Sequence, residues 1–181
     1  MRVLRHTSLL VILALGEFLM MAALELLYFR QLSGGLPSLD VRAFGFTAGE
    51  ATAWLAAIGP SGAQTILVWH YLTFDLIFPA LLAAALASLI IHFGRSLPRF
   101  AKLPERVQTL LAAVLVLPYM GFDYAQNLAV ASILADPFQA KLETILLASS
   151  LVVLKFAFGV IPVLVIVLFA LAGHKRTNRI G

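Results

Sequence analysis

The hydrophobic residues of this chain fall into four long stretches, each almost free of charge. They cover residues 7–29, 66–93, 107–134 and 142–172, and polar connections separate them. An α-helix needs about 20 predominantly apolar residues to cross the hydrocarbon core of a bilayer, which is about 30 Å thick. All four stretches reach that length. The pattern therefore predicts an all-α, polytopic membrane protein, a single transmembrane domain over residues 1–181 in which four transmembrane helices form a bundle.

The composition supports this class and excludes several kinds of chemistry. Hydrophobic residues make up 61% of the 181 residues and charged residues 12%, whereas charged residues are about 25% of a typical soluble protein. The chain has no cysteine, so disulfides, thiolate metal sites and thiol redox chemistry are excluded. No phosphate-binding glycine loop or nucleophilic Ser/His arrangement is visible either.

The first connection, residues 30–65, is long for a helical bundle and contains a second helical signal. Thr47 is followed three residues later by Glu50, which is the spacing of a capping box. After it, apolar side chains recur at helical spacing and a Gly-Pro-Ser-Gly sequence follows at 59–62. The pattern predicts a short amphipathic helix that lies at the outer membrane interface. The alternatives are a lid over the mouth of the bundle and a solvated loop that only covers helix ends.

Basic residues gather in three segments that an even number of helices places on one side of the membrane. These residues are Arg2, Arg5, Arg95, Arg99, Lys102, Arg106, Lys175, Arg176 and Arg179. Loops rich in lysine and arginine stay in the cytoplasm, so both termini are predicted to be cytoplasmic in a bacterial inner membrane. The first apolar stretch is longer than the core of a signal peptide, about 7–15 residues, and is interpreted as a retained helix. Since topology accounts for the net charge of +4, no nucleic-acid partner is expected.

One charged residue lies near the middle of each predicted helix: Glu17, Asp75, Asp123 and Lys155. A rise of about 1.5 Å per residue places these four about 13–20 Å below the outer ends of their helices. Charged groups inside a membrane are costly, and they normally face the bundle interior or a water-filled cavity. Four of them at similar depth predict one shared polar site.

Polar neighbours extend the predicted site. Tyr119, Asp123 and Asn127 follow one another at four-residue spacing, so they share a helix face. His70 is also a candidate, although it precedes Asp75 by five positions, about 140° around a regular helix. Pro79 has no backbone N–H, so the carbonyl of Asp75 is expected to lack its helical hydrogen bond.

The charges of this predicted site do not balance. Glu17, Asp75 and Asp123 face the single ammonium of Lys155, which leaves a formal charge of −2 if all of them ionise. Protonation, a bound cation or entering water would each relieve it. We therefore expect the site to bind protons or a small cationic or amphipathic, lipid-like ligand. One alternative is a structural or accessory subunit of an oligomer or larger membrane complex, in which the charges lock helices together. Another is a membrane enzyme that uses acid–base chemistry on a lipid.

A metal site and a cofactor are not expected from the sequence. His70 with Asp75, Glu25 and Asp123 would offer mixed nitrogen and oxygen ligands. No histidine pair has the spacing of a known metal motif, however, and the other three histidines stand beside basic residues at the ends of helices. The expected partners are membrane lipids and a small hydrophobic or cationic ligand.

Three segments resemble a widespread group of small bacterial four-helix membrane proteins. They are the segment from Gly45 to Gly62, the FDLIFP sequence of 74–79 and the FDYAQN sequence of 122–127, with Gln126 where that group has an acidic residue. The FDLIFP segment is also similar, more distantly, to the second helix of the EXPERA group of sterol isomerases and sigma-2-type receptors. That resemblance implies a cavity for a hydrophobic amine or sterol-like ligand, with Glu17, Asp75 or Asp123 as its acids.

Overall fold

The computed structural model describes residues 6–180, and it describes side chains as far as residue 174. The chain is all-helical, and four helices are long and apolar enough to span a membrane: Thr7–Leu32, Ala48–Gly94, Glu105–Ala135 and Leu142–His174. The predicted fold class is therefore confirmed, and the protein is a multi-pass membrane protein. Of the basic residues used above for topology, Arg2 and Arg5 lie outside the described residues, as do the side chains of Lys175, Arg176 and Arg179.

Two of the four spans contain a π-helical segment. The first span consists of α1 (Thr7–Leu24), the π-helical η2 (Glu25–Phe29) and α2 (Arg30–Leu32). The second consists of α3 (Ala48–Ile66), the π-helical η4 (Leu67–Phe74) and α4 (Asp75–Gly94). In a π-helix, hydrogen bonds join residues five apart, and such segments are frequent at functional sites.

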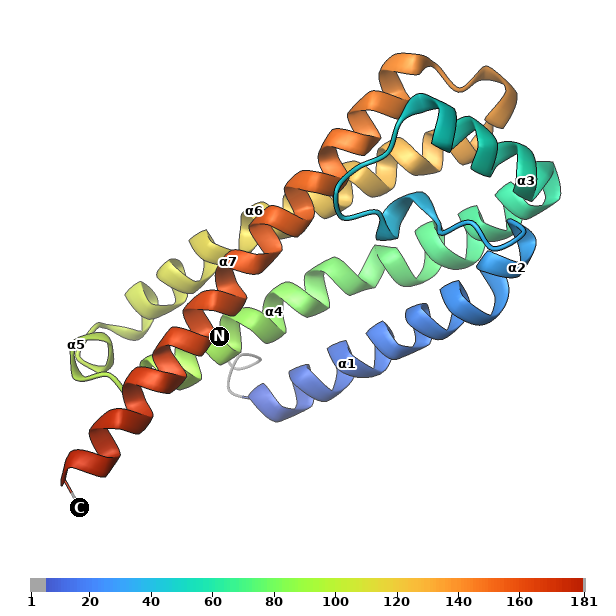
Figure 1. Ribbon diagram of the computed structural model, residues 1–181. Coiled ribbons are helices and arrows are strands. Elements are labelled where there is room, and N and C mark those ends of the chain that lie inside the picture. The colour runs from blue at the N-terminus through green and yellow to red at the C-terminus, as the bar shows by residue number, and fades with distance from the viewer. Residues whose placement is uncertain (1–5, 181) are drawn as a thin grey trace.

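The third and fourth spans form an antiparallel pair. A short helix, α5 (Pro98–Ala101), leads into α6 (Glu105–Ala135), and η5 (Pro137–Gln139) connects α6 to α7 (Leu142–Ile180). Helix α6 packs along α7, and α4 packs against both of them. Helix α1 packs mainly on α4 and stands at the outside of the bundle (Figure 1).

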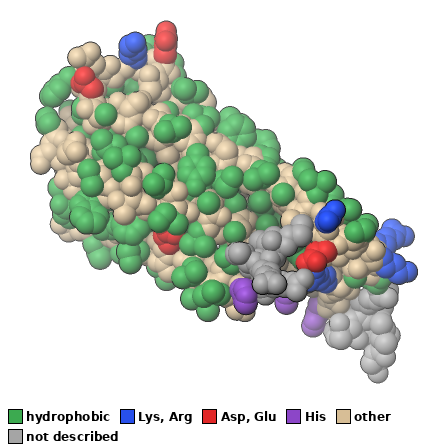
Figure 2. Space-filling model, turned by 180° about the vertical axis from the view of Figure 1, so that it is seen from behind, with side chains coloured by type: hydrophobic (Ala, Val, Ile, Leu, Met, Phe, Trp, Pro, Cys, Tyr) green, Lys and Arg blue, Asp and Glu red, His purple; other side chains and the backbone are tan. Residues whose placement is uncertain are grey.

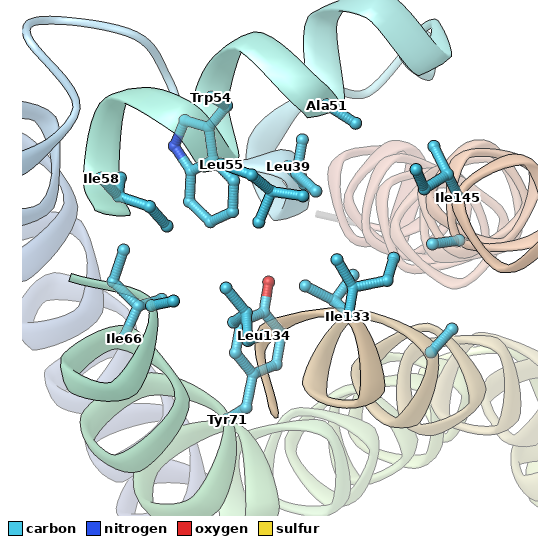
Figure 3. Packing of buried hydrophobic residues seen from close by; sticks show 14 of the residues in the cluster. Leu39, Ala51, Trp54, Leu55, Ile58, Ile66, Tyr71, Ile133, Leu134 and Ile145 are labelled. Carbon is cyan, nitrogen blue, oxygen red and sulfur yellow. The ribbon is translucent and has the colours of Figure 1, made fainter. Parts of the chain in front are cut away.

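Helix α3 lies across the end of the bundle that is opposite α5 and the C terminus (Figure 1). Its N-terminus has the predicted capping box, in which Thr47 and Glu50 exchange hydrogen bonds between side chain and backbone. The apolar stripe of α3 faces inward: Trp54 and Leu55 are buried over Ile133 and Leu134 at the end of α6 (Figure 3). The amphipathic helix is therefore present, and it packs as a cap on the bundle.

A glycine produces the bend that joins this cap to the second span. Gly59 has φ 61° and ψ −179°, a backbone conformation that is essentially restricted to glycine. Pro60 follows it, and the helix resumes at once. The Gly-Pro-Ser-Gly sequence therefore kinks the helix and does not end it, so the helical chain begins at Ala48, earlier than the predicted start at residue 66.

The surface agrees with a membrane location. Hydrophobic side chains cover most of the face shown in Figure 2, whereas Lys, Arg and His side chains gather toward one end of the molecule. Large apolar residues are exposed along the outward sides of the long helices, for example Leu27 on η2, Leu110 on α6 and Leu168 on α7. Exposed apolar side chains on all the spans are what lipid contact requires.

Candidate functional site

Five ionisable side chains meet inside the bundle, just beneath the cap. We call them the polar cluster: Asp40, His70, Asp75, Asp123 and Lys155. Each of them is less than one-tenth exposed. They come from the first connection, η4, α4, α6 and α7, so three of the four spans contribute to the cluster and the first span does not. Buried charges are normally paired, and the pairing inside this cluster is uneven.

Lys155 is the centre of the well-paired half of the cluster. Its Nζ donates to Oδ1 of Asp40, to Oδ1 of Asp123 at 3.2 Å and to Oε1 of Gln126 at 2.8 Å. The hydroxyl of Tyr119 donates to the other oxygen of Asp123 at 2.8 Å. The ammonium thus uses its three donors on three acceptors. The predicted meeting of Asp123, Tyr119 and Lys155 is observed.

Asp40 is the member of the cluster that sequence reasoning missed. It lies in the short 3₁₀ turn η3 (Leu39–Val41), and the fully buried Leu39 beside it anchors the turn under α3. Burial alone would raise the pKa of the Asp40 carboxyl, but Lys155 and His70 lower it more than burial raises it, so this pKa lies well below its usual range. Asp40 is therefore a carboxylate. Its only sequence signal was an acidic residue between the apolar residues Leu39 and Val41.

Hydrogen bonds on both sides hold the connection that carries Asp40 in place. On the α1 side, the backbone N–H and the hydroxyl of Ser38 donate to Glu25 at 3.0 and 2.6 Å. On the α7 side, the hydroxyl of Ser149 accepts from the N–H of Phe46 and donates to its carbonyl. Gly45 has φ 84°, and an added Cβ would lie 2.8 Å from the Ser149 hydroxyl. Asp40 is thus positioned by the fold of the whole connection.

His70 and Asp75 form the second half of the cluster. The Nε2 atom of His70 lies 3.3 Å from Oδ2 of Asp75 and 3.6 Å from Oδ2 of Asp40. A regular α-helix would separate His70 and Asp75 by about 140° around its axis. Because η4 is π-helical, residues five apart come close to one face. That local change of helix type brings the imidazole to the carboxylate.

The backbone of Asp75 is held by a neighbouring helix. Pro79 lies one turn further along α4 and cannot donate to the carbonyl of Asp75. The side-chain amide of Asn127 on α6 donates to that carbonyl instead, at 3.2 Å. The predicted free carbonyl therefore has a partner, and Asn127 is the residue that supplies it.

Several polar atoms around Asp75 and His70 are buried without a hydrogen bond. Within the part of the chain whose side chains are described, they are Asp75 Oδ2, both ring nitrogens of His70, Asn127 Oδ1, Gln126 Nε2 and the Tyr71 hydroxyl. Buried polar groups are nearly always satisfied in native proteins. The unsatisfied atoms of His70 and Asp75 contrast with the complete coordination of Lys155.

A cavity of about 530 Å³ reaches the polar cluster. Its apolar lining includes Phe18 and Met21 of α1, Phe78 of α4, and Val160 and Val163 of α7. The polar end contains all five members of the polar cluster together with Tyr119. The space is therefore amphipathic, with apolar side walls and an acidic end.

The two acids of the first span do not join the polar cluster. Glu17 is half-buried on α1 and is absent from the described cavity lining. Glu25 lines the cavity but has its own partners, Ser38 and Arg30, the latter at 3.5 Å. The predicted imbalance between three acids and one lysine holds, but Asp40 takes the place assigned to Glu17. The reason is that α1 packs at the edge of the bundle, so a mid-helix residue on it need not face the centre.

No family model, curated protein or solved structure matches this chain. The four long apolar helices support the class of four-helix membrane proteins, whereas the resemblances to particular groups remain predictions.

Proposed function

We propose that this protein binds an amphipathic, lipid-like molecule that enters from the membrane between α1 and α7. The supporting observation is the cavity, which has apolar walls and ends at buried, unsatisfied polar atoms of Asp75 and His70. Its volume of about 530 Å³ is within the range of small-molecule sites, roughly 300–1,000 Å³. A molecule with an apolar tail and a polar head matches both halves of this space.

The tail would lie along the apolar walls. Phe18 and Met21 of α1 face Phe156 and Val160 of α7 across the cavity. Helix α1 rests mainly on α4, so the side between α1 and α7 is the one through which a membrane-dissolved molecule would enter. Lateral entry needs no path through water, which suits a ligand that partitions into lipid.

The head would lie against the His70–Asp75 half of the polar cluster. The polar cluster has three carboxyl groups but one ammonium: Lys155 pairs with Asp40 and Asp123, whereas Asp75 lies against His70. Additional positive charge is needed at this end, and an ammonium on the ligand, a proton or a bound cation would each supply it. The cationic head is the simplest form of the ligand expected from the sequence.

We further propose a bacterial cytoplasmic membrane with both termini in the cytoplasm. Arg95, Arg99, Lys102 and Arg106 surround α5 at the end opposite the cap. The positive-inside rule places that end in the cytoplasm. The cap and the polar cluster would then lie toward the outer leaflet, and the ligand would come from that leaflet.

The test compares two substitutions on neighbouring positions of α1. Ala22 lines the cavity, whereas Ala23 is exposed and does not line it. Mass spectrometry of the intact protein released from mild detergent reports molecules that remain bound. We expect wild type and Ala23→Trp to retain bound amphipaths and Ala22→Trp to lose them. Equal retention by both variants, or no retention by wild type, would contradict the proposal.

A second candidate function is structural, and the coordination of Lys155 favours it. Its ammonium ties together Asp40 of the connection, Asp123 of α6 and its own helix α7. A protein whose charges only lock helices, alone or in a larger membrane complex, would need this half of the cluster. It would not need the cavity or the unsatisfied atoms at Asp75, which is why we place it second.

A further inference from the structure

We propose that Asp40, His70 and Asp75 bind a first-row divalent metal ion, such as Zn²⁺, at the polar end of the cavity. The ion would supply the positive charge that the cluster lacks, and it would leave one coordination position for the ligand's head. Only that last role rests on the ligand binding proposed above. The sequence does not predict this metal site, since no histidine pair has the spacing of a known metal motif and Asp40 lies in an irregular connection.

The geometry of the three side chains is that of a metal site. One ligand atom from each residue can be chosen so that all three lie within 4.8 Å of one another. The imidazole Nε2 lies 3.3 Å from one carboxylate oxygen and 3.6 Å from the other. In a tetrahedral zinc site with bonds of about 2.1 Å, ligand atoms are separated by about 3.4 Å. The two measured separations are close to that value before any ion is placed.

Two of the three ligand residues, His70 and Asp75, are buried and offer ligand atoms that accept or donate no hydrogen bond within the described side chains. His70 is 5% exposed and Asp75 is 2% exposed. Neither nitrogen of His70 nor Oδ2 of Asp75 has a hydrogen-bond partner within the described side chains. A neutral imidazole nitrogen and a carboxylate oxygen are both metal ligands. A metal ion would satisfy Nε2 of His70 and Oδ2 of Asp75 together.

The surrounding residues orient these ligands. Lys155 engages Oδ1 of Asp40, which leaves Oδ2 toward His70. Asn127 fixes the backbone of Asp75 through its carbonyl. Outer partners of this kind commonly hold metal ligands in position.

Charge also favours a divalent ion. Three carboxylates of the polar cluster and one ammonium leave a formal charge of −2 when His70 is neutral. A divalent cation brings that sum to zero. Three protein ligands leave a zinc ion one open position, and all three residues line the cavity. With the charge of the cluster balanced by the metal ion, the head of the ligand need not be cationic, and an oxygen donor such as a hydroxyl, carboxylate or phosphate would bind the metal.

The experiment uses the full chain, purified in detergent without an affinity tag and stripped with a chelator. Co²⁺ is added, and its visible absorption reports tetrahedral nitrogen and oxygen coordination, while calorimetry with Zn²⁺ gives stoichiometry and affinity. We expect about one ion per chain and a tetrahedral cobalt spectrum. Asp75→Asn and His70→Gln should weaken Zn²⁺ binding by more than about tenfold, the lower end of what even the loss of an outer partner costs.

The matched control is His92→Gln, which changes an exposed histidine of the same span and should bind metal like wild type. A wild-type protein that takes up no Co²⁺ overturns the proposal, as does equal affinity of His70→Gln and wild type. The cobalt spectrum of wild type shows whether the protein binds a metal ion in tetrahedral coordination, even where a variant does not fold. Metal uptake is measured without amphipath, and amphipath retention is measured by comparing Ala22→Trp with wild type. The metal-site proposal and the ligand-binding proposal can therefore fail independently of each other.

Discussion

The side-chain amide of Asn127 lies 3.2 Å from the backbone oxygen of Asp75 and donates a hydrogen bond to it. This contact joins α6 to the carbonyl that Pro79 leaves without a helical donor. The acid at the polar end of the cavity is thereby held by a neighbouring helix. The amide of Asn127 on α6 thus replaces the backbone donor that Pro79 on α4 lacks.

That pairing gives a double-mutant prediction. Asn127→Leu removes the donor and should destabilise the protein by about 1–3 kcal/mol, the cost of an unsatisfied buried acceptor. Pro79→Ala restores an N–H one turn away, so Asn127→Leu should cost less in that background. Reversible unfolding in mixed detergent micelles measures all four free energies of unfolding. Simple additivity of the two substitutions would show that Asn127 does not compensate for Pro79.

Lys155 should be the most sensitive position of the polar cluster. Lys155→Met leaves Asp40 and Asp123 without their ammonium, and removing one partner of a buried ion pair typically costs about 3–5 kcal/mol. Adding Asp123→Asn should recover part of that loss. The measurement is the same unfolding assay, with the exposed Lys141→Met as the control. A Lys155→Met protein as stable as that control would refute the ion-pair network.

The ionisation of Asp40 should make stability depend on acid pH. Against the effect of burial, Lys155 and His70 hold the folded pKa of Asp40 well below its usual range, whereas the unfolded pKa is about 3.9. The ionised group therefore adds stability above the unfolded pKa, and this contribution is lost as pH falls toward the folded pKa.

The comparison is between wild type and Asp40→Asn, both stripped with a chelator so that metal binding does not contribute, in thermal unfolding from about pH 7 to pH 3. Wild type should be the more stable protein by a constant margin near neutrality, and the margin should shrink below about pH 4. A margin that stays constant or widens on acidification would mean that Asp40 is not the low-pKa carboxylate described here.

Much of the fold follows from signals that are local in the sequence. The four spans follow from the length of the apolar stretches, and the start of α3 follows from the spacing of Thr47 and Glu50. The meeting of Asp123 with Lys155 follows from the cost of a charge in hydrocarbon, which drives such residues toward each other.

The remaining parts of the polar cluster depend on features that periodicity does not encode. Asp40 lies in an irregular connection, and it reaches the cluster because Leu39 and the loop contacts fold that connection inward. His70 reaches Asp75 because η4 winds as a π-helix. Glu17 stays apart because α1 packs at the edge of the bundle. The placement of Asp40, His70 and Glu17 thus depends on tertiary packing and on local helix type. The depth of a residue along a helix, which the sequence does predict, does not determine it.

The central claim, a membrane-facing site between α1 and α7, is tested most directly by photo-crosslinking. Two probes share one long alkyl tail with a diazirine and differ in the head, an amine or a hydroxyl. The protein in lipid nanodiscs is irradiated with each, and labelled peptides are mapped. We expect labelling concentrated on 18–26 and 156–163, the stretches of the first span and of α7 that line the cavity, and its loss in Ala22→Trp but not in Ala23→Trp. Labelling spread evenly over the exposed faces of all the spans, and unchanged in Ala22→Trp, would contradict the account.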